Sequence, residues 1–284
     1  FAHFEYLKDS FQNDLNCCIP VEYPVEAALG TVDFVSEDVF GSASPNNGNY
    51  NSEAAIHAYY KLLNCGFRLG LAAGTDFPCN ESEPLGTLLT YVKMKNKGLT
   101  YDKWINGIRE GRTVVSRNGH KEFIEFKAEG NHEPGDEIKI KNKKLVSLSV
   151  KWTAVKEFTG TIELVCNGKV IASQQASVTP GKPFIMNTTH EITESSWICA
   201  RRMDEKGHES HTAPIYFVVN NKPIRASAED AQYFISWIDR LMEKTSPGGS
   251  WNRYFTHDLD VVQARYLKAK LIYSTILKEA EGRK

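Results

Sequence analysis

The chain has 284 residues, of which 41% are hydrophobic and 24% are charged, and its formal net charge at pH 7 is -1. Such a chain can bury a substantial core, and its length is typical of about two domains. The near-neutral charge gives no electrostatic basis for binding nucleic acid or an anionic membrane. No apolar run approaches the roughly 20 residues that span a bilayer, so we expect no membrane span. The composition does not indicate an oligomeric state.

The first residues are Phe1-Ala2-His3, without an initiator Met or a targeting segment. We therefore expect the chain to begin within a strand of a longer or processed protein. His3 follows small and apolar residues and is a candidate metal ligand. The alternative is an ordinary packed histidine beside aromatic residues.

The segment 62–78 has the sequence LLNCGFRLGLAAGTDFP. It predicts a helix that ends near Gly66 and a short apolar strand, 69–73, followed by Gly74-Thr75-Asp76. A carboxylate at the carboxyl end of a buried strand is a metal-ligand or catalytic candidate, because α/β barrels build their chemistry at that face. The alternative for Asp76 is a turn cap before Phe77-Pro78.

Several segments, taken in order, resemble the carbaryl-hydrolase-like branch of the polymerase-and-histidinol-phosphatase (PHP) metal-dependent hydrolases. The most specific are LNCGFRLGLAAGTDF at 63–77 and REGRTVVSRNG at 109–119. The others are AHF at 2–4, VEAALGTVDFVSE at 25–37, GTLLTYVKM at 86–94, LVCNGKVI at 164–171, SSWICARR at 195–202 and HTAPIYFVV at 211–219. Together they cover nearly the whole chain.

The resemblance implies a distorted (β/α) barrel that binds divalent metal (Zn, Mn or Fe) and hydrolyses phosphate esters or related bonds of a small, anionic substrate. His3 resembles the late barrel histidine and Asp76 the closing aspartate. The family's His-x-His strand precedes the part seen here. Many members have Asp-x-His at the closing aspartate, whereas this chain has Pro78 in place of that histidine. We therefore expect an incomplete metal site in this chain. A non-catalytic binding or scaffold protein descended from the family is the alternative function.

Three segments are predicted, which makes the fold class α/β plus β. Residues 1–119 alternate short strands and helices, as in the latter half of a PHP-type barrel. Residues 123–221 have a period of two and predict a small antiparallel β-sandwich. Residues 226–284 are predicted to form C-terminal helices.

Helices are predicted where apolar residues recur at helical spacing. They cover 52–63, 101–110 with Thr100 as cap and Trp104 in its buried stripe, a stretch that follows Ser227 as cap, and 259–279. The Ser-, Asn-, Gly- and Pro-rich segment 41–50 is predicted to be a loop that reaches over an active-site mouth.

In the predicted sandwich, Val146, Leu148, Val150 and Trp152 alternate with polar residues, so Trp152 should lie in the core. Asn167-Gly168 between two apolar runs predicts a type I′ hairpin. About seven strands can be counted in this span.

Two further residues are candidates for substrate binding. Arg112 follows a helix stop and precedes an apolar strand, so it is placed to hold an anionic group through paired hydrogen bonds; a structural salt bridge is the alternative. His211 belongs to Gly207-His208-Glu209-Ser210-His211, which is predicted to lie between strands of the sandwich and lacks the helical frame of a His-Glu-x-x-His zinc site.

The six cysteines show no zinc-binding spacing. Cys65, Cys166 and Cys199 lie in apolar contexts and are predicted to be small buried hydrophobic residues, whereas Cys79 follows Asp76 closely enough to line the site. Cysteine usage does not identify the compartment, although the proteins that the chain resembles are often exported from bacteria.

Overall fold

The computed structural model describes residues 11, 20–35, 52–75, 85–95, 98–205, 207–255 and 257–283, with the backbone alone described for 52–55. The elements of the first part are α1 (Tyr23–Leu29), β1 (Phe34–Val35), α2 (Ser52–Asn64), β2 (Gly70–Leu71), β3 (Leu89–Val92), α3 (Tyr101–Arg109) and β4 (Thr113–Ser116). A short 3₁₀ turn, η2 (Gly119–Lys121), leads to β5 (Glu122–Ala128), β6 (Glu137–Ile140), β7 (Lys144–Ala154), β8 (Phe158–Cys166), β9 (Lys169–Val178), β10 (Phe184–Ile192), β11 (Ser196–Asp204), β12 (Gly207–Thr212) and β13 (Ile215–Val219). The chain continues through α4 (Ala228–Thr245), η3 (Asn252–Tyr254) and α5 (Leu259–Glu281).

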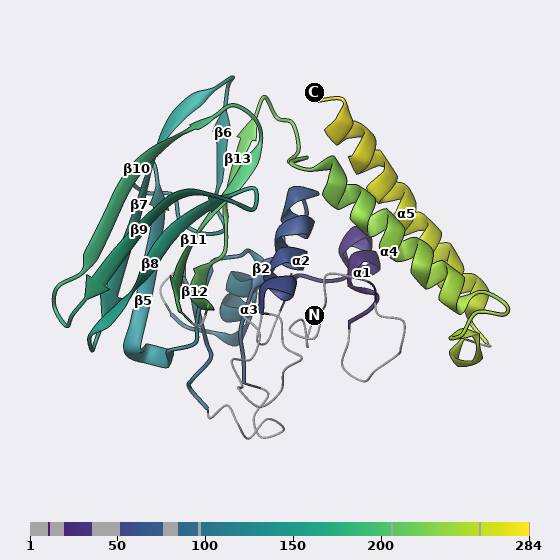
Figure 1. Ribbon diagram of the computed structural model, residues 1–284, viewed down its shortest axis with the longest axis horizontal. Coiled ribbons are helices and arrows are strands. Elements are labelled where there is room, and N and C mark those ends of the chain that lie inside the picture. Colours follow the sequence, from purple (N-terminus) through teal and green to yellow (C-terminus); the bar gives the residue numbers. More distant parts are fainter. Residues whose placement is uncertain are drawn as a thin grey trace.

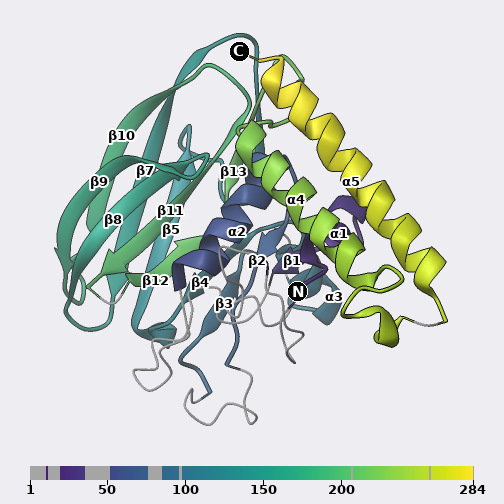
Figure 2. The same cartoon turned by 45° about the vertical axis from the view of Figure 1, so that its right-hand side comes forward.

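These elements form three layers (Figures 1 and 2). The outer layer on one side is a sheet in the order β10-β7-β5, and the middle layer is a larger, curled sheet in the order β3-β4-β12-β11-β13-β6. Helices α2, α4 and α5 lie on the other side, with α2 between the middle sheet and α4. The chain is therefore a mixed α/β protein dominated by strands, with a curled half-barrel sheet and C-terminal helices.

Strand β11 organises the middle sheet. It pairs with β8 along one edge and with β13 and then β12 along the other, and β8 continues into the β8–β9 hairpin. Its side chains alternate between two hydrophobic cores: Trp197 and Cys199 belong to the helix-side core, Ile198 and Ala200 to the sandwich-side core. We use these two names for the two faces of the middle sheet.

The predicted helices are present, and their caps are those expected. The hydroxyl of Thr100 accepts from the Lys103 amide and that of Ser227 from the Asp230 amide. In α5, four residues that recur at helical spacing are buried: Tyr266, Ala269, Tyr273 and Ile276. Trp104 was predicted to be buried but is 36% exposed, because α3 packs through Gly107 and Ile108 instead.

The predicted sandwich strands are also present. Trp152 is fully buried, as predicted, and its strand β7 lies between β5 and β10. Asn167 and Gly168 both have positive φ, 49° and 82°, and connect β8 to β9, which confirms the Asn-Gly hairpin.

The strand count from the sequence was too low. The described part of 123–221 contains nine strands, because β6 and β12 were not predicted. The segment Gly207–Thr212, predicted to lie between strands, is strand β12 and is buried from His208 onward. Its polar side chains find partners inside the protein, so their polarity does not exclude a buried strand. The β13–β6 pair is parallel, whereas the other pairs of this span are antiparallel.

The middle sheet joins the first two predicted segments. Strands β3 and β4 come from 1–119, and β4 pairs directly with β12 from the predicted sandwich. The domain boundary between residues 119 and 123 stays a prediction. Backbone hydrogen bonds between β4 and β12 join the two sides of that boundary in one sheet. In the part of the chain that the structure describes, none of the helices has the length and apolarity needed to cross a membrane.

Candidate functional site

The two predicted metal ligands, His3 and Asp76, lie outside the described residues, as do the 41–50 loop and Cys79. The described chain reaches Thr75, the residue before Asp76, and Thr75 is buried. The metal-ligand roles of His3 and Asp76 therefore stay predictions.

Strand β2, which leads to Thr75, runs in the same direction as β4. A Cβ at Gly70 would lie 2.1 Å from the carbonyl oxygen of Ile108, at the end of α3, the helix that precedes β4. Farther along, the amide of Ala73 donates to the hydroxyl of Thr90, which is the register partner of Val115 near the end of β4. The chain therefore leaves β2 toward the end of β4, where Arg117 follows.

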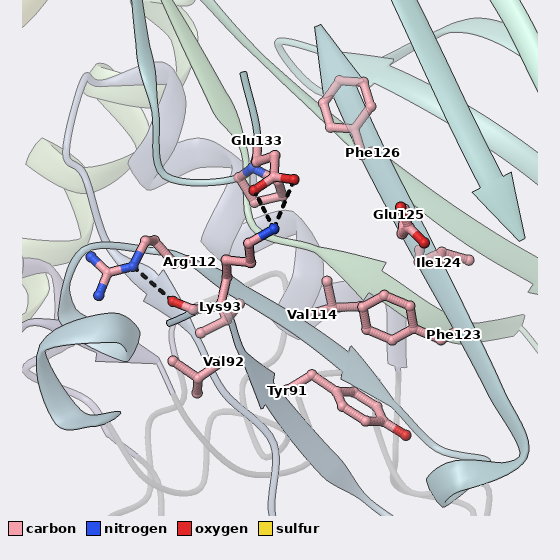
Figure 3. Close-up of a pocket in the computed structure, with 12 residues that line it drawn as sticks. Tyr91, Val92, Lys93, Arg112, Val114, Phe123, Ile124, Glu125, Phe126 and Glu133 are labelled. Atoms are coloured by element: carbon pink, nitrogen blue, oxygen red, sulfur yellow. Dashed lines mark hydrogen bonds and ion pairs between the residues drawn. The ribbon is translucent and has the colours of Figure 1, made fainter. Parts of the chain in front are cut away.

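Arg112 lines a pocket of about 420 Å³ between β3, β4 and β5, together with Tyr91 and Phe123 (Figure 3). Figure 3 shows its guanidinium on the side of the pocket away from Phe123. Its Nε donates to the Lys93 carbonyl oxygen at 3.0 Å, and Nη1 pairs with Glu110. This geometry is that of a structural ion pair, and the substrate-binding role of Arg112 stays a prediction.

His211 is completely buried on the helix side of the middle sheet, opposite to the face on which the pocket of Arg112 opens. Its Nδ1 lies 2.6 Å from the carbonyl oxygen of Thr212, so Nδ1 carries the proton. Its Nε2, 2.7 Å from the Tyr60 hydroxyl, is then the acceptor. Burial, and secondly Arg201, lowers the pKa of His211 to about 3, so the imidazole is neutral at physiological pH.

His208 lies on the same face as His211, with their ring centroids 6.3 Å apart. Its Nε2 is 2.9 Å from Nη1 of Arg201. Because a guanidinium can only donate, Nε2 accepts and the proton is on Nδ1. Burial is the largest cause that lowers the pKa of His208 well below its usual value, followed by Arg201, His211, His57 and Arg117.

His57 of α2, Arg117 after β4 and Arg201 of β11 lie near enough to His208 of β12 to lower its pKa. We call these four residues the basic cluster. Glu163 binds Arg201 through Nε and Nη2, each at 2.7 Å, and offsets part of its charge. His57 is exposed and Arg117 is half-buried, so the cluster extends from the interior to the surface.

On the sandwich side, Arg202 and Glu122 form a buried ion pair with side chains 1% and 0% exposed. Nε and Nη2 of Arg202 reach the two carboxylate oxygens of Glu122 at 2.7 and 2.9 Å, and the Trp152 indole donates to the same carboxylate at 2.8 Å. Adjacent residues of β11, Arg201 and Arg202, therefore serve opposite faces of the sheet.

The described residues do not provide a metal site. No three His, Cys, Asp or Glu side chains of the described ranges are placed to hold a metal ion. The lone pairs of the two buried imidazoles already accept hydrogen bonds, from Arg201 to His208 and from Tyr60 to His211. The described part therefore supplies hydrogen-bond donors and positive charge instead of ligands.

The cysteines that the structure describes are buried, as predicted. Burial raises the pKa of Cys166 to about 11 and that of Cys199 to about 12, so both are protonated thiols.

Four basic residues of these networks were not identified from the sequence: His57, Arg117, Arg201 and Arg202. One signal was available. SWICARRM is an apolar strand that contains two adjacent arginines, and adjacent residues of a buried strand must point to opposite faces, where each arginine needs a partner. His57 and Arg117 gave no such signal, because they reach the cluster only through tertiary packing.

No protein-family model matches the chain, and no curated protein matches it. Among solved structures, the solution structure of the CARDB domain of PF1109 from Pyrococcus furiosus is 12% identical, with 36% of this chain and 99% of that domain aligned and a TM-score of 0.26. The crystal structure of the same domain in complex with di-metal ions is 14% identical over 34% of this chain and 87% of that one, also with a TM-score of 0.26. The C-terminal domain of wzt is 7% identical over 38% and 74%, with a TM-score of 0.24. Similarities this weak carry no argument about function.

Proposed function

We propose that the chain is part of a hydrolase that acts on a small anionic substrate of the phosphate-ester class. The observation that supports this proposal is the basic cluster, toward which the chain runs as it leaves β2. Arg117 is a permanent cation at the partly exposed end of the cluster, and guanidinium groups bind phosphate oxygens in paired, charge-assisted hydrogen bonds. His208 and His211 are neutral, and their Nε2 atoms already accept hydrogen bonds from Arg201 and Tyr60, so the positive charge for an anion comes from the arginines.

The finer part of the proposal comes from the sequence. The curled sheet would be the latter half of a PHP-type barrel, and His3 and Asp76 would hold a divalent metal together with ligands from outside this chain. The direction of β2 supports this idea, because it brings Thr75, the last described residue before Asp76, toward the end of β4, where Arg117 follows. The alternative is a binding or scaffold protein that holds an anion but does not cleave it.

Arg117→Ala tests the anion site. We expect the variant to bind inorganic phosphate about ten to one hundred times more weakly, because a hydrogen bond to a charged group contributes about 1.5–3 kcal/mol. Phosphate titration by calorimetry measures this loss. Arg240→Ala is the matched control, since Arg240 is an exposed arginine of α4 that pairs with Glu243 at 2.8 Å. Equal phosphate affinity in wild type and Arg117→Ala would contradict the proposal.

Asp76→Asn tests the metal in the full-length protein. It keeps the size and one carbonyl oxygen but removes the charge that holds a divalent cation, so metal content and phosphoesterase rate should fall, the rate by about a hundredfold or more. The turn-cap alternative predicts a nearly silent change, because Asn caps turns about as well as Asp. Metal content, melting temperature and hydrolysis of p-nitrophenyl phosphate with Mn²⁺ or Zn²⁺ are measured on one preparation.

Asp102→Asn in the exposed first turn of α3 is the control for that substitution. If Asp76→Asn leaves metal content and rate unchanged, Asp76 is a structural residue. Phosphate binding by the wild type without any turnover in either metal would favour the non-catalytic binding protein.

A further inference from the structure

Strand β12 contains one extra residue relative to its partner β11. Arg201 pairs with His211 and Arg202 with Ser210, but the next pair is Met203 with His208, so Glu209 has no partner of its own. This is a β-bulge. Residues three apart in a regular strand point to opposite faces of the sheet. The bulge between His208 and His211 is the reason that both side chains lie on the same face.

The extra residue, Glu209, is fixed on the sandwich side. Its carboxylate accepts from Nδ2 of Asn118 at 2.9 Å and lies 3.6 Å from Nη2 of Arg202. Arg202 is itself held by Glu122, and Asn118 donates to Glu122 at 2.6 Å. The carboxylate therefore belongs to a buried network that packing and hydrogen bonds keep in place.

The backbone of Glu209 is tied to the basic cluster as well. Its carbonyl oxygen accepts from the amide of Arg117 at 2.9 Å. The residue before it is His208, whose imidazole contacts Arg201 on the helix side. One residue thus connects the network on the sandwich side to two members of the cluster.

We infer that Glu209 is a positioning residue. Its carboxylate, held by Asn118 and Arg202, fixes the bulge. The bulge in turn keeps His208 in contact with Arg201, and it keeps Arg117 in place through the Glu209 carbonyl. The importance of Glu209 for substrate binding rests on the proposed function, whereas its effect on His208 does not. Without the carboxylate, the side-chain contacts that hold the extra residue on the sandwich side are lost, and β12 can return to regular pairing, which turns His208 away from Arg201.

The tautomer of His208 reports this position directly. Contact with Arg201 requires the proton of His208 to be on Nδ1, and an imidazole released from that contact is free to place its proton on Nε2. His211 has the same Nδ1–H tautomer for an independent reason, its bond to the Thr212 carbonyl. It therefore serves as an internal control for an intact fold.

The experiment is long-range ¹H–¹⁵N NMR of the histidine rings in ¹⁵N-histidine-labelled protein, on the wild type and three variants. In Glu209→Ala, His208 should change from Nδ1–H to Nε2–H while His211 keeps Nδ1–H. Glu209→Gln retains an acceptor for Asn118 and should restore the wild-type His208 signal. Glu125→Ala, which removes a strand carboxylate paired with Lys151 at 3.3 Å, should leave both signals unchanged.

Retention of the Nδ1–H signal of His208 in Glu209→Ala would overturn the inference. If that variant loses both histidine signals because it unfolds, the Asn118→Ala variant provides the test. It leaves Glu209 and its charge in place but removes one hydrogen-bond partner of the carboxylate. The Nε2–H population of His208 should then be higher than in the wild type. An unchanged population in Asn118→Ala would then overturn the inference.

A phosphate titration of the same proteins separates this inference from the proposed function. The affinity of Glu209→Ala for inorganic phosphate should be about tenfold below that of the wild type. If the wild type binds no phosphate but His208 changes tautomer as expected, the proposed function fails and the positioning role stands. If Glu209→Ala binds phosphate like the wild type and His208 keeps its tautomer, the positioning role fails and the anion site stands.

Discussion

Replacing Glu122 with alanine is expected to lower the free energy of unfolding by about 3–5 kcal/mol, because it leaves Arg202 as a buried charge without its main partner. The other carboxylates near Arg202 are poor substitutes, since Asp204 and Glu209 lie 3.5 and 3.6 Å from its nitrogens. The same substitution removes the acceptor of the Trp152 indole in the sandwich core. Leaving a buried donor without an acceptor adds to the cost.

Urea unfolding at pH 7 measures this effect. Glu122→Gln should cost less than Glu122→Ala, because its amide oxygen still accepts from Trp152 or Arg202. The matched control is Glu125→Ala in the same strand, where the exposed pair with Lys151 contributes about 0–1 kcal/mol. A loss below about 1 kcal/mol for Glu122→Ala would contradict this account, because it would mean that water or another carboxylate satisfies Arg202 in place of Glu122.

The parts of the fold that the sequence predicted are those governed by local chemistry. The caps at Thr100 and Ser227, the Asn167-Gly168 turn and the burial of Trp152 depend on neighbouring residues and on periodicity, which a single sequence contains. Strand β12 was missed for the opposite reason. Its residues are polar, and their burial depends on partners such as Tyr60, 151 residues away from His211.

The arrangement of the candidate site was not predictable from periodicity. His208 and His211 are three residues apart, which in a regular strand separates them, and only the bulge at Glu209 unites them. The sequence grouped Arg112 with His211 as substrate-binding candidates, but β4 and β12 place them on opposite faces of the middle sheet. Face assignment requires the register, and a one-residue shift in register reverses it.

The continuity of the middle sheet bears on how the proposed hydrolase would be assembled. Arg117 reaches the basic cluster from the predicted barrel portion, and Arg201 and His208 reach it from the predicted sandwich. Because β4 pairs with β12, the two portions hold the cluster between them through backbone hydrogen bonds. A barrel portion separated from the sandwich would lack two of the four basic residues.

The acid stability of the protein should depend strongly on His211. Its pKa is 6.5 when unperturbed and about 3 in the folded protein, so between these pH values the unfolded chain binds a proton that the folded chain does not. Stability is therefore lost as the pH falls from about 6.5 to about 3, and this one group contributes about 5 kcal/mol over the whole window. The groups that face His211 are Tyr60 from α2, Cys199 and Arg201 from β11, and His208, whose own lowered pKa acts in the same direction.

His211→Gln removes the titrating ring but retains an acceptor and a donor. The variant should be less stable than the wild type at pH 7, because it fits the Tyr60 and Thr212 contacts less well. Since the variant has no imidazole to protonate, the difference in free energy of unfolding between the wild type and the variant should narrow by about 2–3 kcal/mol between pH 7 and pH 4.5. Urea unfolding at several pH values measures the gap, and His257→Gln, an exposed histidine, should give a curve parallel to that of the wild type. A gap that stays constant with pH would show that His211 takes up its proton in the folded protein as readily as in the unfolded chain.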